Sequence, residues 1–225
     1  KNKVKRFVMT SSFAAIYGNE KTEYTDNDWT DLSRENLFPY EISKTKAELF
    51  LWEYIESLDK KDRIEVCAIN PVLVVGPSLS DSISISNKVT LKKMLNGSIP
   101  FTPKLSVSVV DVEDVAWAHV KAMKEENAAG KRFLLSEKTM WLSDISNILY
   151  ENGFKKVPRY DAPNWLLKFL SIFISSLRLT LGRLGEKEIL HTNNAKNILK
   201  WHPNTVDRAI IESAKQLHDQ NSITK

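Results

Sequence analysis

The chain has 225 residues, of which 42% are hydrophobic and 27% are charged. These proportions exclude an intrinsically disordered chain, a collagen-like chain and a disulfide scaffold, and the length allows one large domain or two small ones. The 32 Lys and Arg residues against 28 Asp and Glu residues give a net charge of +4, and the basic residues form no dense stripe, so nucleic-acid binding is not expected.

The predicted elements alternate between strands and helices. The expected strands are Val4–Ser11, Ile64–Asn70, Val107–Val112 and Arg132–Leu135. The expected helices are Glu41–Leu58, Ile83–Leu95, Asp114 to about Lys124, Leu142–Asn152, Trp165–Leu181, Asn193–Leu199 and Thr205–Gln220. This alternation predicts an α/β layer structure with parallel strand pairing.

Hydrophobic periodicity supports the first and the last of these helices. In the first helix the residues that follow the 3.6-residue period are Ala47, Leu51, Tyr54, Ile55 and Leu58. In the last helix the residues expected to face inward are Val206, Ala209, Ile210, Ala214 and Leu217. The polar segment Tyr24–Phe38 is expected to be a long surface connection.

The most apolar segment is Trp165–Leu181, which Lys168 and Arg178 interrupt. Its uncharged stretch is far shorter than the 18 or more residues of a membrane span, so we expect no membrane span. A buried or groove-lining helix is the first interpretation, and a membrane-surface or partner-docking helix is the alternative. The chain opens with Lys, Asn and a strand-like run, so no signal peptide is expected.

Cys67 is the only cysteine, and it lies inside an apolar run. We interpret it as a small core residue in a reducing compartment, which predicts a cytoplasmic protein. The four histidines show no paired ligand spacing, so no metal site is predicted.

Three features with chemical potential occur in a consistent order. The first strand delivers hydroxyl groups at its carboxyl end, where ligands bind in open α/β sheets: Thr10, Ser11 and Ser12. Tyr40 and Lys44 lie four residues apart at the start of the first helix, on one helix face. The next strand ends in the extended segment Asn70–Pro77 (NPVLVVGP), which is able to lie along a ligand.

The Tyr40–Lys44 pair suits proton transfer to a carbonyl oxygen. An unperturbed tyrosine has a pKa near 10, and a nearby ammonium group lowers that pKa by favouring the phenolate. Such a tyrosine can donate a proton to a carbonyl oxygen while hydride reaches the carbon, and a serine hydroxyl can hydrogen-bond the same oxygen. General acid catalysis of this kind contributes roughly 10²- to 10⁴-fold in rate.

With these motifs and VVDVEDVAWAH at Val109–His119, the chain resembles the extended short-chain dehydrogenase/reductases. The similarity also includes VKRFVMTSSFAAIYG at Val4–Gly18, and its nearest subgroup is the dihydroflavonol reductase-like enzymes of the NAD-dependent epimerase/dehydratase superfamily. The resemblance implies the C-terminal part of a Rossmann-type parallel sheet with a smaller, mostly helical substrate-binding lobe. It assigns residues 1–80 and 106–125 to the Rossmann-type domain, and 81–105 and 126–225 to the lobe.

The same resemblance implies an NAD(P)-dependent oxidoreductase that reduces an aldehyde or ketone with a Ser12-Tyr40-Lys44 triad. Tyr40 would be the acid–base, Lys44 would bind the nicotinamide ribose, and Ser12 would polarise the substrate carbonyl. The cofactor is NADP or NAD, with NADP favoured. The residues implied at the cofactor are Thr10, Ser11, Tyr40, Lys44, Pro71, Val72 and Leu73.

Alternatives remain at this stage. Epimerase-type relatives carry the catalytic hydroxyl one position later, where this chain has Phe13, so Ser12 is preferred and Ser11 is a weaker candidate. Tyr17-Gly18 is unlike the plant flavonoid reductases, so no flavonoid substrate is assumed. A nucleotide-sugar epimerase or dehydratase, or a non-catalytic truncated remnant, are the alternatives to a carbonyl reductase.

None of the seven glycines lies in a Gly-rich phosphate-binding loop. The resemblance therefore implies that about 100 residues of an N-terminal dinucleotide-binding part are absent. An uncovered sheet edge would then invite association, as a homo-oligomer or otherwise.

We predict that the 225-residue chain alone binds NAD(P) weakly or not at all, because no Gly-rich loop is present to hold the pyrophosphate. Titration with NADPH should leave its tryptophan fluorescence almost unchanged. Tight, saturable quenching would contradict this expectation.

Overall fold

The computed structural model describes residues 4–18, 21–35, 37–79, 91–173 and 181–219. The chain divides into two compact units. Unit 1 consists of residues 1–72, 113–136 and 189–203, and unit 2 consists of residues 73–112, 137–188 and 204–225. The chain therefore passes between the units several times.

Unit 1 is built on a three-stranded parallel sheet of order β1-β3-β6, with β1 at Arg6–Thr10, β3 at Glu65–Pro71 and β6 at Arg132–Leu135. Met9 pairs with Ala68 and Asn70 with Leu134 in register. The central strand β3 is a nearly continuous apolar run, the pattern of a strand buried on both faces. Parallel pairing and all three strands confirm the prediction.

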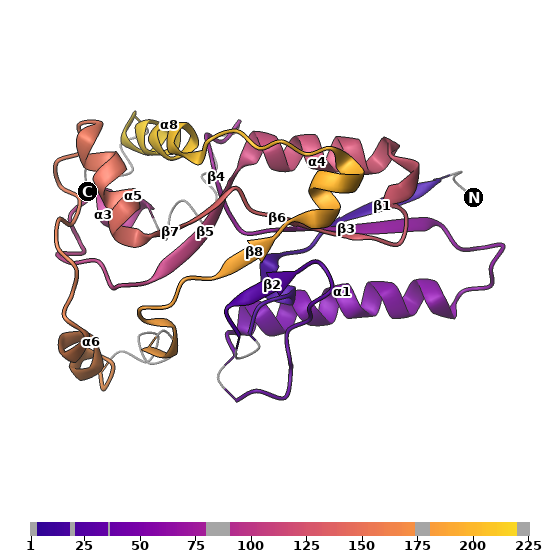
Figure 1. Ribbon diagram of the computed structural model, residues 1–225, viewed down its shortest axis with the longest axis horizontal. Coiled ribbons are helices and arrows are strands. Elements are labelled where there is room, and N and C mark those ends of the chain that lie inside the picture. Colours follow the sequence, from indigo (N-terminus) through magenta and orange to yellow (C-terminus); the bar gives the residue numbers. More distant parts are fainter. Residues whose placement is uncertain (1–3, 19–20, 36, 80–90, 174–180, 220–225) are drawn as a thin grey trace. The chain divides into compact units, whose positions relative to one another are not determined.

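Two helices cover opposite faces of this sheet, α1 (Pro39–Ser57) on one side and α4 (Val112–Lys124) on the other (Figure 1). α1 begins with Pro39 in its first turn, where the missing backbone N–H costs nothing. The Glu41 side chain accepts a hydrogen bond of 2.8 Å from the backbone N–H of Phe38. Pro39 and the Glu41 cap therefore determine where α1 begins. The start of α1 in turn determines the position of Tyr40, in the first turn of the helix.

The predicted first helix forms as α1, and its buried residues are Glu41, Thr45 and Glu48, whereas Ala47 and Tyr54, which follow the 3.6-residue apolar period, are exposed. The apolar period therefore locates this helix without identifying its most buried face. This face of α1 instead meets polar groups of the strands and loops, which need hydrogen-bond partners once water is excluded.

The segment between β1 and α1 is also more buried than expected. It contains the 3-10 helix η1 (Phe13–Ala15) and the short strand β2 (Glu23–Thr25), which pairs in parallel with β8 (Ile189–His191). Tyr24 and Asp26 in this segment are buried. The prediction of a surface connection over 24–38 was therefore wrong. The unit also includes η3 (Glu126–Ala128) and a π-helix, η5 (Ala195–Leu199).

Unit 2 contains a second sheet of order β4-β5-β7, with β4 at Leu73–Val75, β5 at Ser106–Asp111 and β7 at Lys138–Trp141. β4 and β5 are parallel, but β5 and β7 are antiparallel, so the prediction of parallel pairing holds only in part. The helices α5 (Leu142–Glu151) and α8 (Val206–Asp219) pack together, α5 on β7 and α8 on β4 and β5. All five residues of α8 predicted to face inward are buried.

The remaining elements of unit 2 are α3 (Lys93–Leu95), α6 (Asn164–Leu170) and η4 (Leu181–Arg183). Most of the predicted helix over 83–95, and residues 174–180 of the predicted helix over 165–181, lie outside the described residues. In the part that is described, Trp165 and Phe169 are exposed and Leu167 is buried, so this part of the helix is not buried on all sides. Within the described ranges, no helix has the length and apolar character needed to cross a membrane.

Cys67 lies in β3 and is fully buried, as predicted for a core residue. Burial away from water raises the pKa of its thiol to about 11 because the thiolate cannot be solvated there. The thiol is therefore a structural, unreactive group at neutral pH.

Gly76 follows β4 and has a backbone that only glycine adopts without strain, with φ at +136°. A Cβ atom there would overlap Cγ1 of Val112, whereas a Cβ at Gly153, where φ is +97°, would meet nothing within 4 Å. We expect Gly76→Ala to lower the free energy of unfolding by about 1–3 kcal/mol more than Gly153→Ala, because both share the backbone strain and only the first adds overpacking. Urea denaturation of both variants measures the difference, and equal losses would contradict the clash.

Candidate active site

The three hydroxyl groups after β1 have three different partners, all within unit 1. The hydroxyl of Ser11 donates to Oε2 of Glu48. Oγ of Ser12 accepts a hydrogen bond of 3.1 Å from the backbone N–H of Ala14 and so caps η1. Because this bond uses only a lone pair, the hydroxyl proton of Ser12 remains able to donate.

Thr10 interacts with a residue that the sequence interpretation did not assign. Its Oγ1 lies 2.7 Å from Nε2 of His119 on α4, and Nδ1 of that ring lies 2.8 Å from the backbone carbonyl of Val115. A carbonyl only accepts, so in the neutral ring Nδ1 carries the proton and Nε2 accepts from Thr10. No sequence pattern indicates a contact between His119 and Thr10, because the two residues come together only in the folded chain.

Tyr40 and Lys44 lie at the start of α1, beside the end of β1. The Tyr40 side chain is 57% exposed. Nζ of Lys44 donates to the backbone carbonyl of Thr10 at 3.2 Å and lies 5.9 Å from the centre of the Tyr40 ring. The structure thus brings Lys44 next to both Tyr40 and the strand end that carries the hydroxyl groups.

The other residues implied at a cofactor, Pro71, Val72 and Leu73, lie where β3 ends and β4 begins. Pro71 closes β3, and the next residue, Val72, donates its backbone N–H to the carbonyl of Leu135 at 3.1 Å. Both belong to unit 1. Leu73 begins β4 and belongs to unit 2, so the structure does not place it relative to Tyr40.

Beneath these residues lies a buried polar cluster centred on Glu48, whose exposure is 0%. Oε1 of Glu48 accepts from Nε of Arg132 at 2.6 Å and from Nε1 of Trp52 at 3.4 Å. Oε2 accepts from Nδ2 of Asn70 at 2.7 Å and from the hydroxyl of Ser11. The carboxylate therefore joins α1 to β1, β3 and β6.

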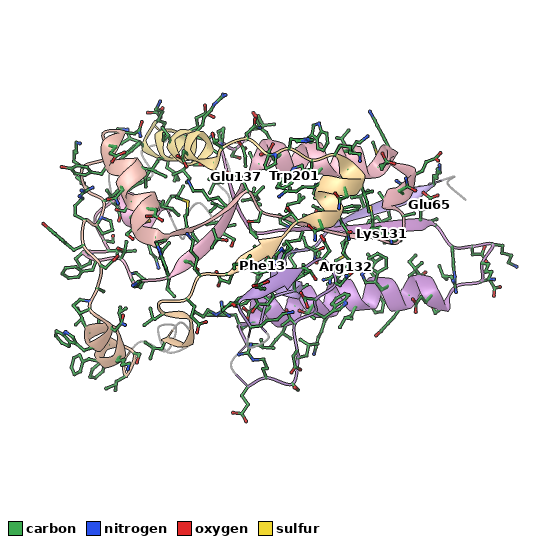
Figure 2. All side chains as sticks on the ribbon, in the orientation of Figure 1. Phe13, Glu65, Lys131, Arg132, Glu137 and Trp201 are labelled. Carbon is green, nitrogen blue, oxygen red and sulfur yellow. The ribbon has the colours of Figure 1, made fainter. Side chains whose placement is uncertain are left out.

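Arg132 carries the positive charge of this cluster and reaches from β6 toward α1 (Figure 2). Its Nη1 donates to the backbone carbonyl of Asp26 at 3.0 Å, and its guanidinium stacks 3.8 Å above the ring of Trp29. Both partners belong to the segment between β1 and α1 that was expected to lie on the surface. Arg132 and Glu48 together explain why that segment is buried.

Asp26 is a second buried carboxylate in unit 1. Burial raises its pKa because the charged form loses solvation, although backbone N–H groups of Leu134 and Asn194 donate to the carboxylate and oppose that rise. Its contacts fix β6 and the residues before η5, so its role is structural. Across the described residues, no group of three or more His, Cys, Asp or Glu side chains is placed to hold a metal ion.

The Arg132–Glu48 pair should be a large contributor to the stability of unit 1. Arg132→Met leaves the Glu48 carboxylate buried without a counter-ion, and we expect a loss of about 3–5 kcal/mol in the free energy of unfolding. The control is Lys121→Met, which breaks a partly exposed pair between Lys121 on α4 and Glu125, the residue after that helix. It should cost at most about 1 kcal/mol. Similar losses for the two variants in urea denaturation would contradict the expectation.

The curated proteins similar to this chain include several reductases. A cinnamoyl-CoA reductase of Medicago truncatula is 35% identical over 158 residues, which are 66% of this chain and 45% of that protein. An NADPH-dependent methylglyoxal reductase of Saccharomyces cerevisiae is 29% identical over 164 residues, 66% of this chain and 48% of that protein. The chain spans about half the length of the curated relatives it matches.

Solved structures show the same fold. The yeast methylglyoxal/isovaleraldehyde reductase in complex with NADPH superposes with a TM-score of 0.76 at 23% identity, covering 98% of this chain and 65% of that one. Vestitone reductase from alfalfa (Medicago sativa) superposes with a TM-score of 0.72 at 21% identity, covering 97% and 66%. Both likenesses establish the α/β fold that the alternating elements predicted and the Rossmann type that the family resemblance implied.

The family profile described as the 3-beta hydroxysteroid dehydrogenase/isomerase family matches residues 1–155. This stretch includes β1 with its hydroxyl groups, the Tyr40–Lys44 turn of α1, and β3. The chain belongs to the 3-beta hydroxysteroid dehydrogenase/isomerase family, within the extended short-chain dehydrogenase/reductases.

Proposed function

We propose that this chain carries the catalytic side chains of an NADPH-dependent reductase that acts on an aldehyde or ketone. The observation that carries the proposal is the position of Lys44, whose ammonium group contacts the Thr10 carbonyl and lies beside the ring of Tyr40. The reductases among its relatives support the reaction class, and the relatives named as NADPH-dependent or solved with NADPH favour NADP over NAD.

The donor groups present fit a nicotinamide nucleotide. The Lys44 ammonium has three N–H donors, and the Thr10 carbonyl takes one, so donors remain for ribose hydroxyls. The apolar end of β3, at Pro71 and Val72, suits the face of an aromatic ring. When bound, the nicotinamide would supply the hydride.

Tyr40 would supply the proton. Its exposed phenol can reach a ligand, and the Lys44 ammonium group lies 5.9 Å from the centre of its ring. Lys44 would hold the ribose beside Tyr40. Hydride from the reduced nicotinamide and the proton of Tyr40 would convert the carbonyl group to an alcohol. The oxidised nicotinamide and a tyrosinate would remain, and the tyrosinate would regain its proton from solvent.

Ser12 is a better candidate than Ser11 to hydrogen-bond the substrate oxygen. Ser11 already donates its only proton to Glu48, whereas the hydroxyl of Ser12 accepts from Ala14 and keeps its proton for a ligand. Phe13, at the position that holds the catalytic hydroxyl in epimerase-type relatives, packs edge-on against Tyr24 with ring centres 5.5 Å apart. An aromatic residue there argues against the epimerase alternative.

The broader organisation follows from these assignments as part of the proposal. Unit 1 corresponds to the remainder of a dinucleotide-binding domain, and unit 2 supplies residues of a substrate-binding lobe. The substrate is a small carbonyl compound. A cytoplasmic location is consistent with one buried, unpaired cysteine.

Tyr40→Phe tests the mechanism in the full-length protein. We expect carbonyl reduction to fall by at least about 10²-fold, because the general acid is lost, while the affinity for NADPH stays within about twofold. Initial rates and fluorescence titration with NADPH provide the two measurements.

The matched control is Tyr54→Phe, which removes an exposed hydroxyl from the same helix 14 positions later. It should leave the rate unchanged. Wild-type turnover in the Tyr40→Phe protein would disprove the mechanism.

A further inference from the structure

The two groups proposed to act on the substrate oxygen lie on different elements. Ser12 follows β1, and Tyr40 is in the first turn of α1. Their separation must be fixed to within a fraction of an ångström for both to bind one oxygen atom, because small displacements of reacting groups are costly. Something must therefore hold the end of β1 against α1.

Glu48 is placed to do this. It lies two turns after Tyr40 and one turn after Lys44 on α1, and it is fully buried. Its Oε2 accepts the hydroxyl proton of Ser11, the neighbour of Ser12. The link between helix and strand is thus made one residue away from the proposed catalytic serine.

A second connection runs from Glu48 to Ser12 itself. Nδ2 of Asn70 donates to Oε2 of Glu48 at 2.7 Å and also to the backbone carbonyl of Ser12 at 3.2 Å. Both acceptors are oxygens, so the orientation of the Asn70 amide is determined. The carboxylate of Glu48 therefore restrains the Ser11–Ser12 segment at two points. It binds the Ser11 hydroxyl directly, and it holds the Ser12 carbonyl through Asn70.

The other oxygen of the carboxylate has a different role. Oε1 accepts hydrogen bonds from Arg132 and Trp52, and Arg132 also donates to the backbone carbonyl of Ala15 at 3.5 Å, three residues after Ser12. Oε1 thus bonds to residues away from the proposed site, and Oε2 bonds to the residues that hold the Ser11–Ser12 segment. This separation allows the two roles to be tested independently.

We propose that Glu48 is a positioning residue for carbonyl reduction, which holds the Ser11–Ser12 turn at a fixed place relative to Tyr40. The proposal rests on the proposed function. Glu48 does not contact the substrate in this proposal. Its effect on the reaction passes through the position of Ser12.

The experiment uses the full-length protein and compares Glu48→Gln, Ser11→Ala and the control Trp52→Phe. Glu48→Gln keeps the shape of the side chain but removes its negative charge. That charge binds Ser11 and Asn70 through Oε2 and Arg132 through Oε1. Ser11→Ala removes only the hydrogen bond from Ser11 to Oε2 of Glu48. It takes the place of Glu48→Gln if that variant does not fold. Trp52→Phe removes only a bond to Oε1.

We expect kcat for carbonyl reduction to fall about 10- to 100-fold in Glu48→Gln and measurably in Ser11→Ala, with KM and the affinity for NADPH within about twofold of wild type. Trp52→Phe should keep the wild-type kcat. All rates are measured well below the melting temperature of each variant, so a loss of stability alone leaves kcat unchanged.

A double-mutant comparison identifies the route. In a Ser12→Ala background, Glu48→Gln should reduce kcat no further, because the group it positions is gone. Independent, multiplying losses would overturn the proposal, and so would a wild-type kcat in both Glu48→Gln and Ser11→Ala. A wild-type protein with no NADPH-dependent carbonyl reduction would overturn the proposed function itself, and the positioning role with it.

Discussion

The structure of unit 1 depends on one ion pair that is removed from water, between Glu48 on α1 and Arg132 on β6. Two charges are buried only at a cost in solvation free energy, and that cost is offset when hydrogen bonds satisfy the remaining donors and acceptors. Here both oxygens of the carboxylate are used twice, and the guanidinium also binds backbone carbonyls of the segment before α1. Helix, sheet and loop are therefore joined through polar contacts where an apolar core would be expected.

A polar helix–sheet contact has a different consequence from an apolar one. Apolar packing is non-directional and tolerates small shifts of a helix along a sheet. Hydrogen bonds depend strongly on distance and angle, so a helix held by them has one register. A site that uses side chains from both the helix and a strand end benefits from that constraint.

Part of this arrangement could be predicted from the sequence. The four-residue spacing of Tyr40 and Lys44 and the hydroxyl groups after a strand are local features, and the strands of unit 1 have a clear apolar signal. The burial of Glu48 on α1 could not be predicted, because three of its partners, Ser11, Asn70 and Arg132, lie far away in the sequence. The antiparallel direction of β7 and the contact of His119 with Thr10 depend in the same way on tertiary structure.

The buried thiol of Cys67 has a practical consequence. With a pKa of about 11, only about one such thiol in ten thousand is ionised at pH 7, and the sequence has no other cysteine. A cysteine introduced at an exposed position would therefore be the only reactive thiol of the folded chain. Spectroscopic labels could then be attached to α1 or to the β1 end one position at a time, without first replacing a native residue.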